Sequence, residues 1–287
     1  MKFRFQDSPI ECNLPEKVCK YLKDIEKLIQ LKIGYSNIYS IVLFGSYATN
    51  DYSENSDIDL LIVINDEFFK SHSVEYFEYI EKLALAIELK NNLRIKRTSF
   101  ITAVLNIIEK TTGMFVSHFI CKKSDWDKQI FHKIFNVNSF LAKLIAPGDI
   151  VLKNMSKSYL VLYGEKLKPK YKKRISAIQL FKSLIMTELI AVGTVIIFPF
   201  YKNSIKYSLE AFKWTIRNSY LYLFQEPGTQ KQMEEFLTHS SVPKSYCNRY
   251  NELRNNKKRD FRFAVLCPFE ILKIYMISFR YRKIILK

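Results

Sequence analysis

The sequence predicts an α/β domain with a mixed sheet, followed by an α-helical bundle domain. Short apolar runs of strand length occur with helical patterns in residues 1–145, whereas apolar residues recur every three or four positions through long parts of residues 146–287. The chain of 287 residues is long enough for two domains that each bury a core. We place the boundary near Ala146–Asp149, although Lys153–Leu167 could still pack on the first domain.

The first two strands are predicted at Ile41–Phe44 and Ser56–Val63, two apolar runs joined by a polar loop. The first run ends abruptly at Gly45 and Ser46, and Tyr47–Asn50 could start a short helix. A glycine at this place lets the backbone approach a phosphate closely. The N–H groups of a helix start and the serine hydroxyl also favour an anion, so this loop is a candidate phosphate site.

Two carboxylates open the second run. Successive side chains of a strand point to opposite faces, so Asp57 and Asp59 project together while Ile58 points into the core. Two carboxylates this close both stay ionised only if positive charge lies between them. Mg²⁺ takes one or two carboxylates and completes its shell with water and substrate phosphates. The pair therefore predicts half of a Mg²⁺ or Mn²⁺ site whose other ligands arrive with a nucleoside triphosphate.

The complete pattern is Gly-Ser, a spacer of ten residues and Asp-x-Asp between two strand-like runs. It resembles the signature of the DNA polymerase β-like nucleotidyltransferase superfamily, with the spacing of the minimal nucleotidyltransferase group. The resemblance implies that Gly45 and Ser46 hold the triphosphate. It also implies that Asp57 and Asp59 bind metals that activate an acceptor hydroxyl and stabilise the leaving pyrophosphate. The expected reaction transfers a nucleoside monophosphate from the triphosphate to that hydroxyl.

The third carboxylate that many members of this superfamily carry on a later strand is not evident. The helical segment Val74–Lys90 is followed by Asn92–Phe100, which alternates as a strand does. The polar face of this strand offers Arg94, Lys96 and Thr98. Three explanations stay open: another segment completes the sheet, Glu88 or Glu109 supplies the acid, or two carboxylates suffice. A catalytically silent nucleotide-binding or RNA-binding protein is the alternative to an enzyme.

The positive charge of the chain lies in its second half. Residues 1–150 contain 19 Lys and Arg and 19 Asp and Glu, whereas residues 151–287 contain 26 and 9, so the second part carries the whole net charge of +17. A basic domain beside a neutral catalytic domain indicates a polyanionic partner, most commonly nucleic acid. We therefore expect RNA, such as a tRNA end, as the acceptor. A lysine-rich solvated face is the alternative explanation. The other acceptor classes are a small hydroxylated molecule of the aminoglycoside type and a protein hydroxyl.

Helical periodicity dominates the second half. The predicted helices are Ile175–Val195, Ile205–Phe224, Gln230–Leu237 and Phe269–Arg282. In the second helix, Lys213 and Arg217 lie four residues apart and could bind a triphosphate or an acceptor phosphate together. Pairing of Glu210 with its basic neighbours on a solvated face is the alternative. The stretch A-F-K-W-T-I-R-N in this helix resembles the C-terminal helices of kanamycin-type nucleotidyltransferases.

Several other classes of protein are disfavoured by the sequence. The longest apolar run, Leu189–Phe200, has 12 residues, fewer than a membrane span needs, and the N-terminus is charged where a signal peptide is apolar. The five cysteines show no metal-binding spacing, which indicates free thiols in a reducing compartment. His118 lies in an apolar run and is expected to form a structural hydrogen bond. We expect a cytoplasmic protein without membrane contact, and the sequence predicts no oligomeric state.

Overall fold

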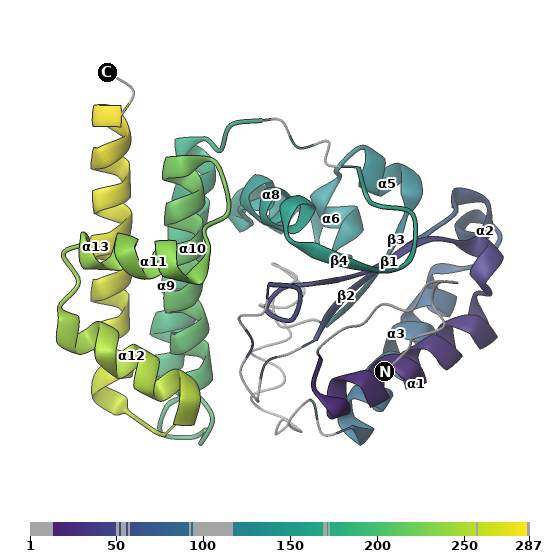
Figure 1. The fold of residues 1–287 in the computed structure, drawn as a ribbon, viewed down its shortest axis with the longest axis horizontal. Helices are drawn as coiled ribbons and strands as arrows, with labels where there is room; N and C mark the ends of the chain where they lie inside the picture. Colours follow the sequence, from purple (N-terminus) through teal and green to yellow (C-terminus); the bar gives the residue numbers. More distant parts are fainter. Residues whose placement is uncertain are drawn as a thin grey trace. The chain divides into compact units, whose positions relative to one another are not determined.

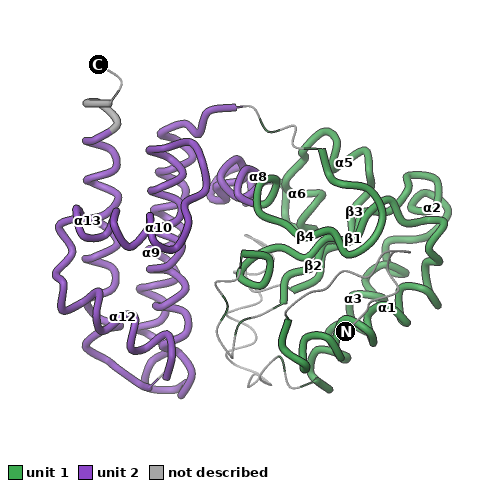
Figure 2. Tube along the Cα trace, in the orientation of Figure 1, with its two compact units in different colours: residues 1–139, 155–171 green, residues 140–154, 172–287 purple. Residues whose placement is uncertain are grey.

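The protein forms two compact units (Figures 1 and 2). The computed structural model describes residues 14–49, 52, 56, 58–91, 93, 117–168, 171, 173–256 and 258–285. Unit 1 comprises residues 1–139 and 155–171, and unit 2 comprises residues 140–154 and 172–287.

Unit 1 combines strands and helices. Its strands are β1 (Ile38–Phe44), β2 (Asp59–Ile64), β3 (His118–Lys122) and β4 (Tyr159–Gly164). Its helices are α1 (Glu16–Lys32), η1 (Tyr35–Asn37), α2 (Asp66–Lys70), α3 (Val74–Lys90), α5 (Lys123–Asp127) and α6 (Phe131–Ile134). Unit 2 is helical and contains α7 (Ser139–Ile145), α9 (Ala177–Ile197), α10 (Ile205–Phe224), α11 (Gln230–Thr238), α12 (Lys244–Asn256) and α13 (Phe261–Ile285). Helix α8 (Gly148–Lys157) passes from unit 2 into unit 1.

The four strands form one mixed sheet in the order β3-β2-β1-β4, which confirms the predicted architecture of the first domain. Strand β1 is antiparallel to β2 and β4, and β2 is parallel to β3. At one end of the sheet Phe44 lies opposite Asp59, and Leu60 lies opposite His118. The start of β2 is therefore flanked by the end of β1 and the start of β3.

Strand β4 comes from the part of the chain that was expected in the second domain. It pairs with β1, from Phe44 opposite Tyr159 to Ser40 opposite Gly164. This pairing covers the edge of β1, whose backbone groups would otherwise lack partners in the sheet. A single boundary between residues 145 and 146 therefore does not describe the two units, because the chain returns to unit 1 for residues 155–171.

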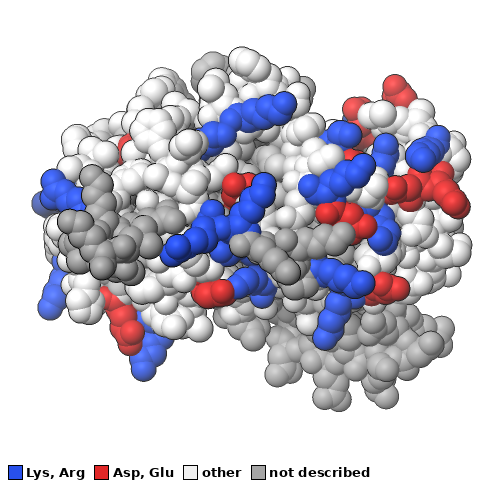
Figure 3. All heavy atoms as spheres, turned by 90° about the horizontal axis from the view of Figure 1, so that it is seen from above, with Lys and Arg blue, Asp and Glu red and all other residues white. Residues whose placement is uncertain are grey.

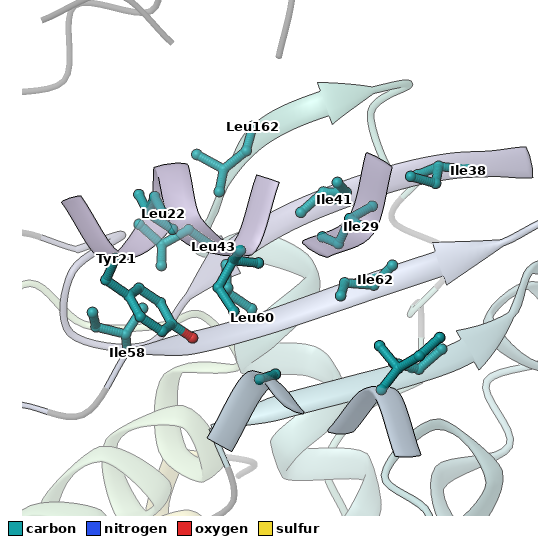
Figure 4. Close-up of a cluster of buried hydrophobic side chains, with 14 of the residues drawn as sticks. Tyr21, Leu22, Ile29, Ile38, Ile41, Leu43, Ile58, Leu60, Ile62 and Leu162 are labelled. Atoms are coloured by element: carbon teal, nitrogen blue, oxygen red, sulfur yellow. The ribbon is translucent and has the colours of Figure 1, made fainter. Parts of the chain in front are cut away.

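Helices α1 and α3 cover one face of the sheet (Figure 1). Helix α1 turns an apolar stripe toward the strands, because its apolar residues recur at helical spacing. The stripe consists of Val18, Leu22, Ile25 and Ile29, all buried. Alternate residues of β1 and β2 face it, and Figure 4 shows four of them: Ile41, Leu43, Leu60 and Ile62. On the other face, the ring of Phe119 contacts that of Phe135, which ends α6, with centroids 4.8 Å apart.

Helices α9, α10 and α13 pack against one another in unit 2, which confirms the predicted helical bundle. Helix α10 has the expected bounds. Helix α13 begins at Phe261 rather than after Pro268, because the helix continues through this proline despite its missing N–H group. The sequence pattern did not indicate α12, whose buried side, Tyr246, Tyr250 and Leu253, contains two tyrosines and little aliphatic surface.

A buried polar network joins the three long helices of unit 2. The hydroxyls of Ser183 in α9 and Tyr275 in α13 are hydrogen-bonded at 2.7 Å. The amide of Asn218 in α10 donates to Ser183 Oγ at 2.7 Å, and Thr187 Oγ1 donates to Tyr275 Oη at 3.4 Å. Buried polar groups cost stability when they lose a partner, so this network fixes how the three helices pack.

Helix α9 has the length and composition of a membrane-crossing helix, and it alone has them among the described residues. The analysis of the sequence, based on an apolar run of 12 residues, did not anticipate this. Core helices of helical bundles share this property, and α9 packs against α10 and α13.

Replacing Tyr275 with phenylalanine should destabilise unit 2. The variant Tyr275→Phe leaves the buried hydroxyls of Ser183 and Thr187 without their common partner, which is expected to lower the free energy of unfolding by about 1–2 kcal/mol. Urea unfolding followed by circular dichroism measures this loss. The matched control is Tyr281→Phe, because Tyr281 is exposed, and this control should unfold like the unmodified chain. Equal stability of the two variants would show that the network contributes nothing.

Candidate active site

The predicted residues Gly45 and Asp59 lie against each other. The turn after β1 starts at Gly45, which has φ +71°, a conformation that side-chain-bearing residues rarely adopt. A Cβ atom at this position would lie 3.2 Å from Asp59 Cγ and would overlap Asp59 Oδ2. Glycine is therefore required both by the backbone conformation and by the space that the carboxylate occupies.

Residues 45–49 form a turn rather than the expected short helix. The hydroxyl of Thr49 donates to the carbonyl oxygens of Gly45 at 3.2 Å and Ser46 at 3.3 Å, which closes the turn on itself. Ser46 is buried in this turn. The helix-start contribution to anion binding expected from the sequence is therefore absent at these residues, and the glycine turn with its serine is the part of the prediction that the fold retains.

Two stacked tyrosines connect the turn to the segment before β2. The rings of Tyr47 and Tyr52 are stacked with centroids 4.7 Å apart, and the hydroxyl of Tyr47 donates to the carbonyl of Ser56 at 3.5 Å. Tyr47 is almost completely buried. Its ring therefore ties the residues that follow Gly45 to those that lead to the two aspartates.

The structure describes only one of the two predicted metal ligands. Asp59 is the first residue of β2, whereas Asp57 lies outside the described residues. Glu109 and the polar residues Arg94, Lys96 and Thr98 also lie outside them. Within the part of the chain that the structure describes, no group of three or more His, Cys, Asp or Glu side chains could hold a metal ion.

Next to Asp59, four buried residues anchor the start of β3. We call Tyr21, Glu88, Ser117 and His118 the β3 anchor. The hydroxyl of Tyr21 in α1 is hydrogen-bonded to Nε2 of His118, which confirms the structural role expected for this histidine. The hydroxyl of Ser117 donates to Glu88 Oε1 in α3 at 2.8 Å. Glu88, one of the two candidates for a third acid, is thus fully buried and engaged with Ser117.

The β3 anchor is joined to the strand of Asp59 through the backbone. The N–H group of Leu60 donates to the carbonyl of Ser117 at 2.8 Å, directly after Asp59. Burial and the negative charges of Glu88 and Asp59 raise the pKa of the Tyr21 hydroxyl well above its usual value, so this hydroxyl remains neutral. The anchor therefore holds the start of β3, next to Asp59, through buried hydrogen bonds to side chains of α1 and α3.

The predicted phosphate-binding pair on α10, Lys213 and Arg217, is only partly as expected. The ammonium group of Lys213 forms an ion pair with Glu210 at 2.5 Å, which is the pairing expected on the alternative interpretation. Arg217 follows one turn later in the same helix. Both residues belong to unit 2 and Gly45 to unit 1. Nucleotide binding by Lys213 and Arg217 remains a prediction.

The sequence analysis missed Tyr21 and Tyr47. Tyr21 occupies a core-facing position in the stripe of α1, between Val18 and Leu22, where its hydroxyl needs a buried partner. That position was the available signal, since a tyrosine on an otherwise aliphatic stripe implies such a partner. For Tyr47, the sequence alone gives no comparable signal.

The variant Gly45→Ala should abolish most of the nucleotidyl transfer expected from the sequence, because its methyl group displaces the Asp59 carboxylate. A misplacement of about 1 Å can cost roughly 100-fold in rate. Gly34→Ala is the matched control: Gly34 has φ +78°, but a Cβ there meets only Asn37 Nδ2, at 3.6 Å. Both variants carry the backbone strain of about 1–2 kcal/mol. Equal activity of the two, corrected for folded fraction, would refute the role of the Gly45–Asp59 contact.

Loss of the Tyr21 hydroxyl should lower the stability of the protein and raise the Mg²⁺ concentration that transfer requires. Tyr21→Phe leaves buried His118 without this partner, at an expected cost of about 1–3 kcal/mol. It also loosens the anchor beside Asp59, so the Mg²⁺ concentration for half-maximal transfer should rise. Tyr35→Phe serves as control, because it removes a hydrogen bond of 2.9 Å to Glu26 elsewhere in unit 1. Titration of activity with Mg²⁺ distinguishes them, and an unchanged midpoint in Tyr21→Phe contradicts the positioning role.

Comparison with known proteins supports the pattern of the site. The family of nucleotidyltransferase domains matches residues 18–121. A putative protein adenylyltransferase of Methanocaldococcus jannaschii is 37% identical over 84 residues, which are 28% of this chain and 82% of the relative. A second one from this organism is 31% identical over 99 residues, 32% of this chain and 91% of the relative. The family match lies within unit 1, and each relative matches about a third of the chain or less.

A solved structure resembles nearly the whole chain. It is the crystal structure of a spectinomycin adenyltransferase from Enterococcus faecialis with ATP and spectinomycin. The TM-score is 0.50 at 10% sequence identity, and the match covers 89% of this chain and 98% of the other. This likeness shows a shared fold that includes the helical unit. The family match and the relatives, together with the glycine turn against Asp59, show that the chain is a nucleotidyltransferase. It belongs to the DNA polymerase β-like nucleotidyltransferase superfamily.

Proposed function

We propose that the protein transfers AMP from ATP to a hydroxyl group of an RNA acceptor and releases pyrophosphate. The observation that supports the transfer chemistry is the contact of Gly45 with Asp59, because these two residues are the predicted phosphate turn and a predicted metal ligand. ATP as the donor is supported by the names of the adenylyltransferase relatives and by the ATP in the similar crystal structure.

The residues present fit a divalent cation. A hard cation prefers carboxylate oxygens, and the three atoms nearest to a Cβ placed on Gly45 all belong to the Asp59 side chain, so a carboxylate oxygen lies directly at the turn. Asp59, and Asp57 two residues before it, would hold Mg²⁺ or Mn²⁺. When bound, the metal supplies positive charge for the attacking and leaving oxygens.

The chain's own residues bind and orient the reactants. The turn at Gly45 and Ser46 would receive the β- and γ-phosphates through backbone N–H groups and the serine hydroxyl. The acceptor oxygen attacks the α-phosphorus, the bond from this phosphorus to the bridging oxygen of the β-phosphate breaks, and the hydroxyl proton passes to solvent or to a carboxylate. Stacked Tyr47 and Tyr52 keep the turn in place during this exchange.

The charge of unit 2 supports RNA as the acceptor. In the structural units, residues 140–154 and 172–287 contain 23 Lys and Arg against 9 Asp and Glu, so unit 2 carries most of the excess. Figure 3 shows one face of the molecule, on which Lys and Arg lie over both units. A polyanionic acceptor gains from this charge, whereas a cationic aminoglycoside is repelled.

A protein hydroxyl is the second candidate acceptor. The relatives in Methanocaldococcus jannaschii are described as putative protein adenylyltransferases. They match only about 30% of this chain, so their names do not account for the basic charge that favours a polyanionic acceptor.

The decisive experiment follows label from ATP carrying radioactive phosphorus at the α-position. With Mg²⁺ or Mn²⁺, label should appear in total RNA and not in protein or in a panel of small hydroxylated compounds. Asp59→Asn should reduce transfer by more than about 100-fold, since it removes a metal ligand. Asp127→Asn is the matched control, because Asp127 forms a partly exposed ion pair with Lys123 far along the chain.

The possible outcomes test the identity of the acceptor separately from the transfer of AMP. Transfer to RNA should weaken as salt rises, because phosphate contacts release counterions. Label in protein or in a small molecule, lost in Asp59→Asn, would overturn the RNA acceptor and keep the transfer of AMP. No label in any acceptor class with any of the four nucleotides would overturn the proposed activity as a whole.

A further inference from the structure

Helix α9 presents an apolar face to solvent, on the side opposite to the residues that pack on α10 and α13. We call this surface the α9 outer face. Its large side chains are Ile178, Phe181, Leu189, Val192 and Ile196, which are between 47% and 67% exposed. Their spacing of three, four or eight residues places them on one side of the helix. The face therefore runs along almost the entire length of α9.

The exposed apolar strip is of the kind found at protein interfaces. Its five large side chains, four aliphatic and one aromatic, are each roughly half exposed. A standard interface buries about 800 Å² per partner, and in homodimers about 65% of it is apolar. Large exposed apolar patches mark interaction sites, and this strip would supply part of the apolar centre of such an interface.

Gly193 adds an independent reason for a partner. It lies within α9, where glycine is less favourable than alanine because of its backbone freedom. A Cβ atom there would meet nothing within 4 Å, so no packing among the described residues accounts for the glycine. A second helix that approaches the α9 outer face closely would account for it.

The two charged residues of α9 also indicate a partner. Glu188 has one carboxylate oxygen, Oε1, that is buried and has no hydrogen-bond partner among the described residues, and burial raises the pKa of this carboxyl to about 7. Lys182 donates to the carbonyl of Lys143 in α7. The two side chains are six residues apart, which is too far for pairing within one helix. Glu188 Oε1 is therefore left without a hydrogen bond from any described residue, and Lys182 lies too far along the helix to supply one.

We propose that two copies of this chain associate through their α9 outer faces, with the two helices antiparallel and centred on Ile185. This two-fold arrangement places residues equally far before and after Ile185 opposite each other. The resulting pairs are Lys182 with Glu188, Ala177 with Gly193, Ile178 with Val192, and Phe181 with Leu189. Each copy contributes both members of every pair, as an isologous interface requires.

This pattern favours a second copy over a lipid surface or a nucleic acid. An anionic bilayer is bound by helices with several Lys or Arg and with interfacial Trp, whereas α9 has one lysine, one glutamate and no tryptophan. A nucleic acid needs a cluster of bases on the face that it contacts. Apolar surface with a single self-complementary charge pair instead resembles the charge-poor centre of a homodimer interface.

The first test is the mass of the unmodified full chain in solution, measured by light scattering and sedimentation over a wide concentration range. We expect a dimer whose dissociation constant falls as salt rises, because each copy carries a net charge of +17 and screening reduces their repulsion. Association with anionic vesicles or RNA would weaken with salt.

Exchange of the two charges tests the orientation. Lys182→Glu and Glu188→Lys each place like charges opposite each other, and each should weaken the dimer at least tenfold. The double variant restores opposite charges in both pairs and should recover most of the affinity. A loss of folding cannot produce such a recovery, since both changes are present in the double variant.

Steric variants test the close approach at Gly193. Gly193→Leu should fold with an equal or more stable helix, because its side chain enters open space, yet it should weaken the dimer at least tenfold by collision with the other copy. The matched control is Leu31→Lys, which removes an 81% exposed apolar side chain from α1 and should leave the dimer unchanged.

Three results would overturn the proposal. The first is a chain that stays monomeric at the highest concentration reached. The second is a dimer that all the α9 variants leave unchanged, which would place the interface elsewhere. The third is a double charge variant no stronger than either single one, which would exclude the antiparallel pairing. Binding to anionic vesicles by a monomer would identify a lipid surface as the partner instead.

Discussion

The close approach of the Gly45 backbone to the Asp59 carboxylate is the contact on which the catalytic unit depends. It exists because β1 and β2 are antiparallel and end in register, with Phe44 opposite Asp59. The chain must then turn away in a left-handed conformation, which glycine adopts without a steric penalty. The predicted phosphate turn and the predicted metal ligand Asp59 thus become neighbours through the pairing of β1 with β2.

Buried polar groups fix how the elements pack in both units. In unit 1, the β3 anchor ties the strand beside Asp59 to α1 and α3 through Tyr21 and Glu88. In unit 2, Tyr275 connects α9 and α13. Aliphatic packing tolerates small shifts, whereas a buried hydrogen bond lost by such a shift is costly. These networks therefore select one arrangement among several that would bury similar apolar area.

The two units divide the physical tasks. Unit 1 contributes the turn and the carboxylate for transfer chemistry, and unit 2 carries most of the positive charge and the exposed face of α9. The solved structure with a similar fold also combines both parts in one chain. A shared fold does not fix the acceptor, because one fold can carry sites for different substrates.

Local patterns in the sequence determined the strands around Gly45 and Asp59, the bounds of α3 and α10, and the chemical class of the site, because hydrophobic periodicity and the Gly-Ser and Asp-x-Asp spacing are short-range properties. The tertiary structure alone decided two features. Strand β4 joins β1 across more than 100 residues, and Tyr21 meets His118. Both depend on which elements meet in space, so no local pattern specifies them.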